Sequence, residues 1–264
     1  MTERAGLRRV AVSRDRTGPE DMRDDTTPSL ERLKVRLFAD GADLPGLREM
    51  AAHPHISGFT TNPTLMRKAG VADYRAFALE ALKAVGDRPI SFEVFADEPA
   101  EMERQAREIA SWGRNVFVKV PVTTTRGESC APLVRRLAGD GLQLNVTALL
   151  TLEQVREVSQ ALGDGAPAFV SVFAGRVADT GRDPVPHLAA ALRIMAPFPR
   201  QQLIWASPRE LLNVFQADAI GCHVITATHD VLKKLPLVGK DLGEYSLETV
   251  RMFFDDGQAA GYRL

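Results

Sequence analysis

A chain of 264 residues with 45% apolar and 25% charged side chains can bury one large core, which excludes a disordered or fibrous protein. The 33 basic residues nearly balance the 34 acidic ones, so no overall field attracts nucleic acid or an anionic membrane. Cys130 and Cys222 lack CxxC spacing, and no apolar stretch approaches the roughly 20 residues that cross a bilayer. We expect a cytoplasmic protein that binds neither nucleic acid nor membrane.

The N-terminal segment differs from the rest of the chain. Residues 1–33 have many acidic residues and no apolar core of the kind found in a signal peptide. We expect them to form a disordered tail. Residues 34–264 are then expected to form one catalytic domain.

From residue 35 onward, short apolar runs alternate with longer segments of helical periodicity, as is typical of βα units around a parallel sheet. Strands are expected at 35–39, 56–60, 90–95, 116–120, 142–147, 168–173, 202–206 and 222–226. Helical patterns are clearest at 101–112, 152–162, 186–195 and 246–260, and the last is expected to close the barrel or pack over one end. Eight such units predict an α/β protein with a closed (β/α)8 barrel, the TIM barrel.

Polar residues recur inside or just after these apolar runs, always toward the same end. They are Asp40, Thr61, Asn62, Glu93, Lys119, Asn145, Thr147, Ser171, Arg176, Ser207 and Arg209. Barrel enzymes assemble their active sites from the C-terminal ends of the strands and the loops that follow. The pattern therefore predicts a catalytic face.

Lys119 is the most informative of these residues. In the run 116–121 (VFVKVP), strand alternation puts Phe117 and Lys119 on one face and the valines on the other. Valines suit the helix-packed side, so Lys119 is expected to project into the barrel. Desolvation there favours the neutral amine that attacks a ketone. The alternative is an outward lysine whose stem reaches water.

The neighbouring polar residues each have two interpretations. Asp40 and Glu93 form either a general acid/base pair beside Lys119 or ordinary ion pairs. Asn62 precedes Pro63, so its amide either faces a substrate hydroxyl or caps the next helix. Thr147 either aligns a catalytic water or satisfies a backbone carbonyl.

Arg176, Ser207 and Arg209 follow the sixth and seventh strands, where free backbone N–H groups and two guanidinium groups suit a phosphate. Surface arginines are the alternative. No HExxH motif or carboxylate-rich metal loop occurs, so no metal is expected.

Five segments carry a family resemblance. GFTTNPTL, FVKVPVT, LNVTALLT, SVFAGR and ASPRE occur in the order, and at about the spacing, of the transaldolase family. The resemblance covers residue 35 to the end of the chain. Pro208 departs from it, because better-known relatives tend to carry an aromatic residue there, so the phosphate pocket is expected to differ in shape.

The resemblance implies a Schiff-base mechanism without a cofactor, acting on sugar phosphates of the non-oxidative pentose phosphate pathway. Lys119 would form the iminium, Asp40 would take the C4 hydroxyl proton, and Glu93 and Thr147 would handle water and protons. Substrate binding is implied for Thr61, Asn62, Asn145, Ser171, Phe173, Arg176, Ser207 and Arg209.

Two other functions compete with this one. A fructose-6-phosphate aldolase, a close relative, would release dihydroxyacetone to water, but aldolases of that type place glutamine at the position of Glu93 and tyrosine at the position of Phe173. A non-catalytic phosphosugar-binding barrel has no need of Lys119. A homo-oligomer is compatible with the sequence, because helix faces exposed in a monomer and buried in an oligomer have the same pattern.

Overall fold

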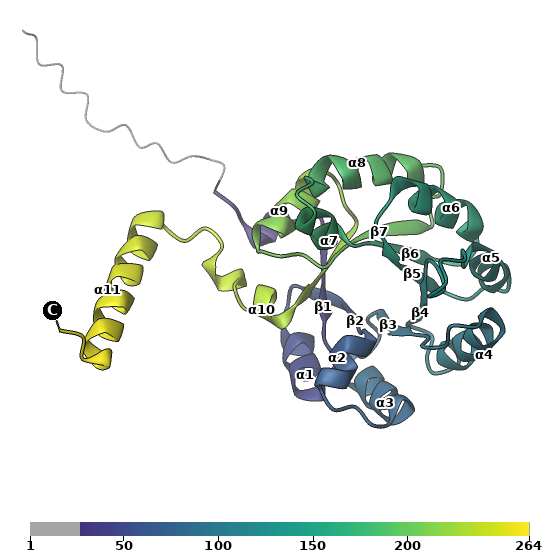
Figure 1. Ribbon diagram of the computed structural model, residues 1–264, viewed down its shortest axis with the longest axis horizontal. Coiled ribbons are helices and arrows are strands. Elements are labelled where there is room, and N and C mark those ends of the chain that lie inside the picture. The colour runs from purple at the N-terminus through teal and green to yellow at the C-terminus, as the bar shows by residue number, and fades with distance from the viewer. Residues whose placement is uncertain (1–26, 264) are drawn as a thin grey trace, which may run out of the picture.

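The eight predicted strands form a closed barrel in the computed structural model, which describes residues 27–263 (Figure 1). Neighbouring strands are parallel and follow one another in chain order, which confirms the predicted TIM barrel. The strands are β1 Arg36–Asp40, β2 Ile56–Thr60, β3 Ile90–Glu93, β4 Val116–Pro121, β5 Leu144–Leu149, β6 Ala168–Val172, β7 Gln201–Ala206 and β8 Val224–Thr228. Of the tail predicted for residues 1–33, residues 1–26 lie outside the described residues.

Helices surround the barrel in a ring (Figure 1). The ring consists of α1 Leu44–Ala52, α2 Pro63–Lys68, α3 Tyr74–Val85, α4 Pro99–Ala110, α5 Ala131–Gly139, α6 Leu152–Leu162, α7 Ala174–Asp179, α8 Pro184–Met195, α9 Leu212–Ala219 and α10 His229–Leu232. A further helix, α11 Leu242–Ala260, lies apart from it. Two 3-10 turns span Leu30–Arg32 and Leu235–Leu237. Helix α6 has the expected bounds because Thr151 and Gln154 form a capping box and Gly163 ends the helix at a positive φ of 53°.

Strands β5 and β8 begin two residues later than expected. The apolar residues assigned to their starts, Leu142 and Cys222, instead end the preceding helices: their N–H groups donate to the carbonyls of Leu137 and Ala217. The residues before them, Gly141 and Gly221, have positive φ values of 84° and 74°. Each glycine completes a Schellman turn, in which an apolar residue follows the glycine. In both turns the apolar residue therefore lies just before the strand but is not part of it.

Strand alternation produces two apolar layers. The valines of β4 belong to the large layer between strands and helices, whereas Phe117 lies inside the barrel. There its ring centroid is 4.3 Å from that of Phe169, which is 5.6 Å from that of Phe38. A Cβ atom on Gly58 would lie 2.4 Å from the Phe38 ring, so only glycine fits there. These rings form a floor below the polar end of the barrel.

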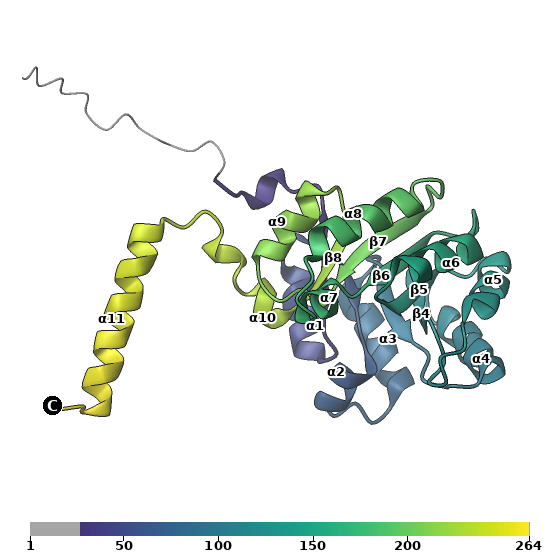
Figure 2. The same cartoon turned by 45° about the horizontal axis from the view of Figure 1, so that its top comes forward.

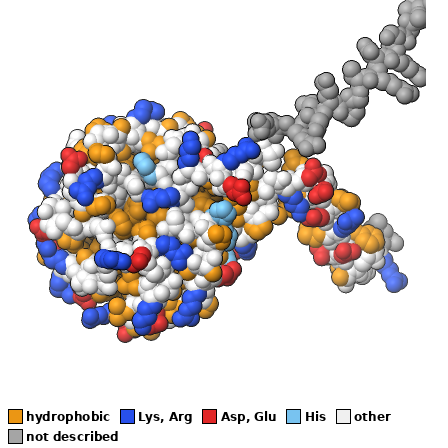
Figure 3. Space-filling model, turned by 180° about the vertical axis from the view of Figure 1, so that it is seen from behind, with side chains coloured by type: hydrophobic (Ala, Val, Ile, Leu, Met, Phe, Trp, Pro, Cys, Tyr) orange, Lys and Arg blue, Asp and Glu red, His pale blue; other side chains and the backbone are white. Residues whose placement is uncertain are grey.

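Helix α11 was expected to close the barrel or pack over one end, and this expectation is wrong. The helix projects away from the barrel (Figure 2), and none of its residues is buried. It begins at an Asp241 cap rather than near Ser246. Apolar side chains are uncovered along the projecting helix (Figure 3), including Phe253 and Phe254 at 64% and 63% exposure. Within residues 27–263, no helix is long and apolar enough to cross a membrane.

Candidate active site

A cavity of about 540 Å³ opens at the C-terminal ends of the strands. It brings together most of the predicted site residues, namely Asp40, Asn62, Glu93, Lys119, Thr147, Ser171, Phe173, Arg176, Ser207 and Arg209. Thr61 and Asn145 are fully buried and do not line it. The polar residues toward one end of the apolar runs therefore do converge on one face.

Lys119 projects inward from β4, as strand alternation predicts. Its side chain is 7% exposed, and its Nζ atom lies 3.0 Å from Glu93 Oε2 on the neighbouring strand. The same Nζ donates to the main-chain carbonyl of Thr61 at 2.8 Å. The alternative of an outward lysine is excluded by this burial. An amine and a carboxylate thus meet at the base of the cavity.

Asp40 ends β1 on another side of the cavity. Its carboxylate accepts hydrogen bonds from Thr60 Oγ1 at 2.8 Å and from Asn62 Nδ2 at 3.3 Å. Burial raises the pKa of the Asp40 carboxyl, although Lys119 and the two hydrogen bonds oppose the shift. No arginine or lysine forms an ion pair with it among residues 27–263, so it is not an ordinary salt-bridge partner.

Asn62 caps the next helix, which is one of its two predicted roles. Its Oδ1 accepts the N–H of Leu65 at 2.9 Å and caps α2, whose first residue is Pro63. This cap fixes the amide so that Nδ2 faces Asp40. A helix cap therefore orients a polar group that lines the cavity.

Buried hydroxyl and amide groups form a row beside Lys119. Asn145 donates to Ser91 Oγ at 2.9 Å and accepts from Ser171 Oγ at 2.7 Å. The Thr61 hydroxyl donates to the carbonyl of Ser91 at 2.9 Å. The side chains of Thr61 and Asn145 are thus held within the wall, and Ser171 is the member of this row that reaches the cavity.

Thr147 lines the cavity with a hydroxyl that has no hydrogen-bond partner among the described residues, although it is buried. It is followed by Ala148, a non-glycine residue with a φ of 65°. Buried hydroxyls normally have a partner. The site therefore suits a water molecule or a substrate oxygen.

The two arginines lie at the opposite part of the wall. Arg209, half exposed, pairs through two nitrogens with Asp179, and the Arg176 guanidinium lies 5.8 Å from the centre of the Phe173 ring. Ser207 has a strained φ of 60°. A Cβ on Gly175 would lie 1.7 Å from the Ser207 carbonyl oxygen, so only glycine allows α7 to approach this closely. The result is a cationic corner suited to an anion.

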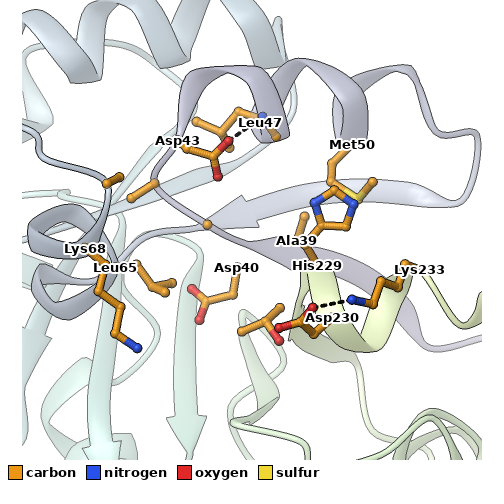
Figure 4. Close-up of a pocket in the computed structure, with 15 residues that line it drawn as sticks. Ala39, Asp40, Asp43, Leu47, Met50, Leu65, Lys68, His229, Asp230 and Lys233 are labelled. Atoms are coloured by element: carbon orange, nitrogen blue, oxygen red, sulfur yellow. Dashed lines mark hydrogen bonds and ion pairs between the residues drawn. The ribbon is translucent and has the colours of Figure 1, made fainter. Parts of the chain in front are cut away.

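A second cavity, of about 650 Å³, adjoins the first between α1, α2 and α10 (Figure 4). Asp40 belongs to the walls of both cavities, whereas Lys119 lines only the first. Lys68 lines the second cavity, and so does Lys233, which pairs with Asp230 at 2.5 Å. Asp40 is therefore reached from both spaces.

The sequence patterns did not single out several residues that support the site. Thr60 holds Asp40, and its hydroxyl lies 2.6 Å from that of Thr226 on β8. The Tyr74 hydroxyl forms two hydrogen bonds with the main chain of Glu93. The threonines lie at the ends of strands, which is a usable signal, whereas Tyr74 begins a helix and its contact with Glu93 gives no local signal.

Comparisons agree with this arrangement. Residues 37–262 match the family model described as Transaldolase/Fructose-6-phosphate aldolase. A protein called "Probable transaldolase" from Dehalococcoides mccartyi is 34% identical over 76% of this chain and 90% of that protein. One of the same name from Sphingopyxis alaskensis is 35% identical over 76% of this chain and 89% of that protein. The chain is an α/β-barrel protein of an enzyme family, and it belongs to the transaldolase/fructose-6-phosphate aldolase family.

Solved structures support the fold alone. A dihydrodipicolinate synthase from Thermotoga maritima superposes with a TM-score of 0.57 at 12% identity, covering 85% of this chain and 81% of that one. At this identity the likeness concerns the barrel and not the chemistry.

Proposed function

We propose that the protein is a transaldolase that moves a dihydroxyacetone unit from a ketose phosphate, sedoheptulose 7-phosphate or fructose 6-phosphate, to an aldose phosphate. The observation that carries the proposal is the buried Lys119 amine, 3.0 Å from Glu93, in the cavity that Asp40 also lines. This combination provides a nucleophile and two acid/base groups within one site.

The first step is the attack of Lys119 on the ketose carbonyl, which gives a carbinolamine. Loss of water from the carbinolamine needs a proton donor, and Glu93 is the acid/base group next to the amine. Thr147 holds the departing water, a role supported by its buried hydroxyl without a partner among the described residues. The product is an iminium, which withdraws electrons from the sugar.

In the second step Asp40 takes the proton of the C4 hydroxyl while the C3–C4 bond breaks. The electron pair of that bond enters the iminium, so an aldose phosphate leaves and an enamine remains on Lys119. The raised pKa of Asp40 supports this role, because a carboxylate that holds a proton more tightly is a stronger base. Addition of the enamine to a second aldose phosphate and hydrolysis complete the cycle.

Phosphate binding falls to Arg176, Ser207 and Arg209. The Asp179 partner of Arg209 is supplied by the protein itself, so a phosphate would compete with it for the guanidinium group. Asn62 and Ser171 are assigned to hydroxyls of the three-carbon unit, and Phe173 to the wall beside it. Thr61 and Asn145 act from within the wall, through the groups to which they are bonded.

The nearest competing function is that of an aldolase, which passes the same enamine to water. Glu93 and Phe173 favour transfer, because they differ from the glutamine and tyrosine expected of the aldolase type. The transaldolase and aldolase functions are distinguished by measuring the dihydroxyacetone released from fructose 6-phosphate with and without erythrose 4-phosphate. We expect transfer to be much faster than release, whereas equal rates would favour the aldolase.

Reduction with borohydride tests the covalent step itself. Incubation with fructose 6-phosphate and borohydride should attach a three- or six-carbon unit to the peptide that contains Lys119, as read by mass mapping. Lys119→Met should give no adduct. A wild-type protein without an adduct would leave only the phosphosugar-binding barrel.

The physiological setting is the non-oxidative pentose phosphate pathway in the cytoplasm, with sugar phosphates as the ligands. Two free buried cysteines and the balanced charge support this location and the lack of nucleic-acid or membrane partners.

The partner protein is a second copy of this chain, which covers α11. At about 100° per residue, the apolar side chains of α11 spread over more than half of its circumference, far wider than the stripe of an ordinary surface helix. Tyr245, Phe253 and Phe254 are 44%, 64% and 63% exposed, so packing against a second copy would remove apolar aromatic surface from water.

A further inference from the structure

The hydroxyl of Tyr74 is bonded twice to the main chain of Glu93. It accepts the Glu93 N–H at 2.8 Å and donates to the Glu93 carbonyl at 2.8 Å. Tyr74 is the first residue of α3, and its ring lies against those of Phe92, Phe95 and Trp112, with centroids 5.5 to 6.4 Å apart. Burial raises the pKa of the Tyr74 hydroxyl, so it keeps its proton and continues to donate.

These two hydrogen bonds take the place of the next main-chain hydrogen bonds between β2 and β3. Up to this level β2 and β3 form a regular parallel ladder, in which Phe59 donates to Pro89 and Thr61 donates to Ser91. Continued by two residues, the ladder would pair the Glu93 N–H with the Thr61 carbonyl. It would also pair the Glu93 carbonyl with the N–H of the residue at position 63.

Glu93 pairs with neither of these groups. Residue 63 is a proline and has no N–H to donate. The Thr61 carbonyl accepts a hydrogen bond from Lys119 Nζ at 2.8 Å. The hydroxyl of Tyr74 therefore satisfies both main-chain groups of Glu93, and the Thr61 carbonyl stays with the amine.

We infer that Tyr74 is a positioning residue for the Schiff-base step: it holds the main chain of Glu93 as a strand would, and it keeps the Thr61 carbonyl for Lys119. The inference rests on the proposed function, since it concerns how the proposed nucleophile and its neighbouring carboxylate are aligned. Small displacements of reacting groups are costly, so a single hydroxyl outside the cavity can govern the rate.

The variant Tyr74→Phe removes the hydroxyl and keeps the ring contacts. Without it, the Glu93 N–H competes with Lys119 for the Thr61 carbonyl. We expect the plateau rate of borohydride trapping with fructose 6-phosphate to fall by about 10- to 100-fold, with KM changed little. The pH midpoint of trapping should move to lower pH, because the charged amine loses part of an acceptor.

Two matched variants separate positioning from packing. Trp112→Phe disturbs the same ring cluster without touching Glu93, and Tyr262→Phe removes an exposed hydroxyl beyond the end of α11. Both should keep the wild-type trapping rate and pH midpoint, with the melting temperature measured for each. The inference is overturned if Tyr74→Phe behaves as the wild type, or if Trp112→Phe reproduces its changes at an equal loss of melting temperature.

A measurement on the wild type does not depend on the folding of any variant. The Glu93 amide has no partner strand on its β2 side, yet its hydrogen exchange should be as slow as that of its β3 neighbours. Exchange at the rate of an open loop would reject the role of Tyr74. A wild type that forms no borohydride adduct would reject the proposed function instead, and a wild type with an adduct beside an unchanged Tyr74→Phe would reject only this inference.

Discussion

Glu93 Oε2 lies 3.0 Å from Lys119 Nζ, and the two residues face each other at the same level of adjacent strands. The pair is nearly buried, with side chains 16% and 7% exposed, so water screens it poorly. A carboxylate in this position can both stabilise the charged amine and exchange protons with the intermediates formed on it. The relationship makes Glu93 the residue whose charge is most informative to remove.

Glu93→Gln keeps the size of the side chain and removes its acid/base function. We expect the transfer rate with fructose 6-phosphate and erythrose 4-phosphate to fall by about 100-fold or more, because proton transfer to and from the carbinolamine is lost. Glu80→Gln, on the exposed face of α3, is the matched control and should be neutral. A Glu93→Gln enzyme as fast as the control would show that the pair is only structural.

Asp40 gives a pH dependence with a definite sign. Its pKa is raised above the ordinary value of 3.8 by burial, so the folded protein binds the proton more tightly than the unfolded chain. Ionisation of Asp40 therefore costs stability progressively as the pH rises from the unfolded pKa through the folded one. In Asp40→Asn this loss is absent.

The free energy of unfolding in urea should therefore increase for Asp40→Asn, relative to that of the wild type, as the pH rises from about 4 to about 7. The exposed Asp164→Asn serves as the control and should show no such trend. A difference that is constant with pH would mean that the Asp40 pKa is not raised. Transfer activity should be lost in Asp40→Asn at every pH.

Strand alternation was sufficient to predict the inward direction of Lys119, and the recurrence of polar residues at strand ends was sufficient to predict the shared cavity. Both depend on local sequence, because alternation and strand order determine which face and which end a residue occupies. The Schellman turns at Leu142 and Cys222 were missed, since an apolar residue after a glycine has the same composition as the start of a strand.

Contacts between distant residues could not be predicted in this way. The hydrogen bonds of Thr60 with Asp40 and of Tyr74 with Glu93 join residues about 20 positions apart, and they depend on how neighbouring units pack. Whether Asn145 points into the cavity or along its wall is likewise set by its partner Ser171. Local periodicity does not determine where α11 lies, because it shows that the helix has an apolar face but not which surface packs against that face.

The cationic corner makes a prediction about substrate affinity. Arg209→Ala should raise KM for fructose 6-phosphate by about tenfold or more with a smaller change in kcat, because a charged hydrogen bond to phosphate is lost. Activity with unphosphorylated donors such as free fructose should change little. Asp179→Asn should lower KM, since it frees Arg209 from its internal partner. Steady-state kinetics with both donors measure these effects, and Arg182→Ala, an exposed arginine nearby, is the control.

Helix α11 provides the final prediction, because the adjacent residues Val250 and Arg251 lie on different sides of it. Val250 lies within the wide apolar arc and is 60% exposed, whereas Arg251 lies on the narrow polar side. Sedimentation of the wild type should give a mass at least twice the 28.9 kDa of one chain. Val250→Asp should shift the mass toward the monomer, because burying an unpaired carboxylate is costly, while Arg251→Asp should retain the oligomer. A monomeric wild type, or equal behaviour of the two variants, would remove the second copy as the partner of α11.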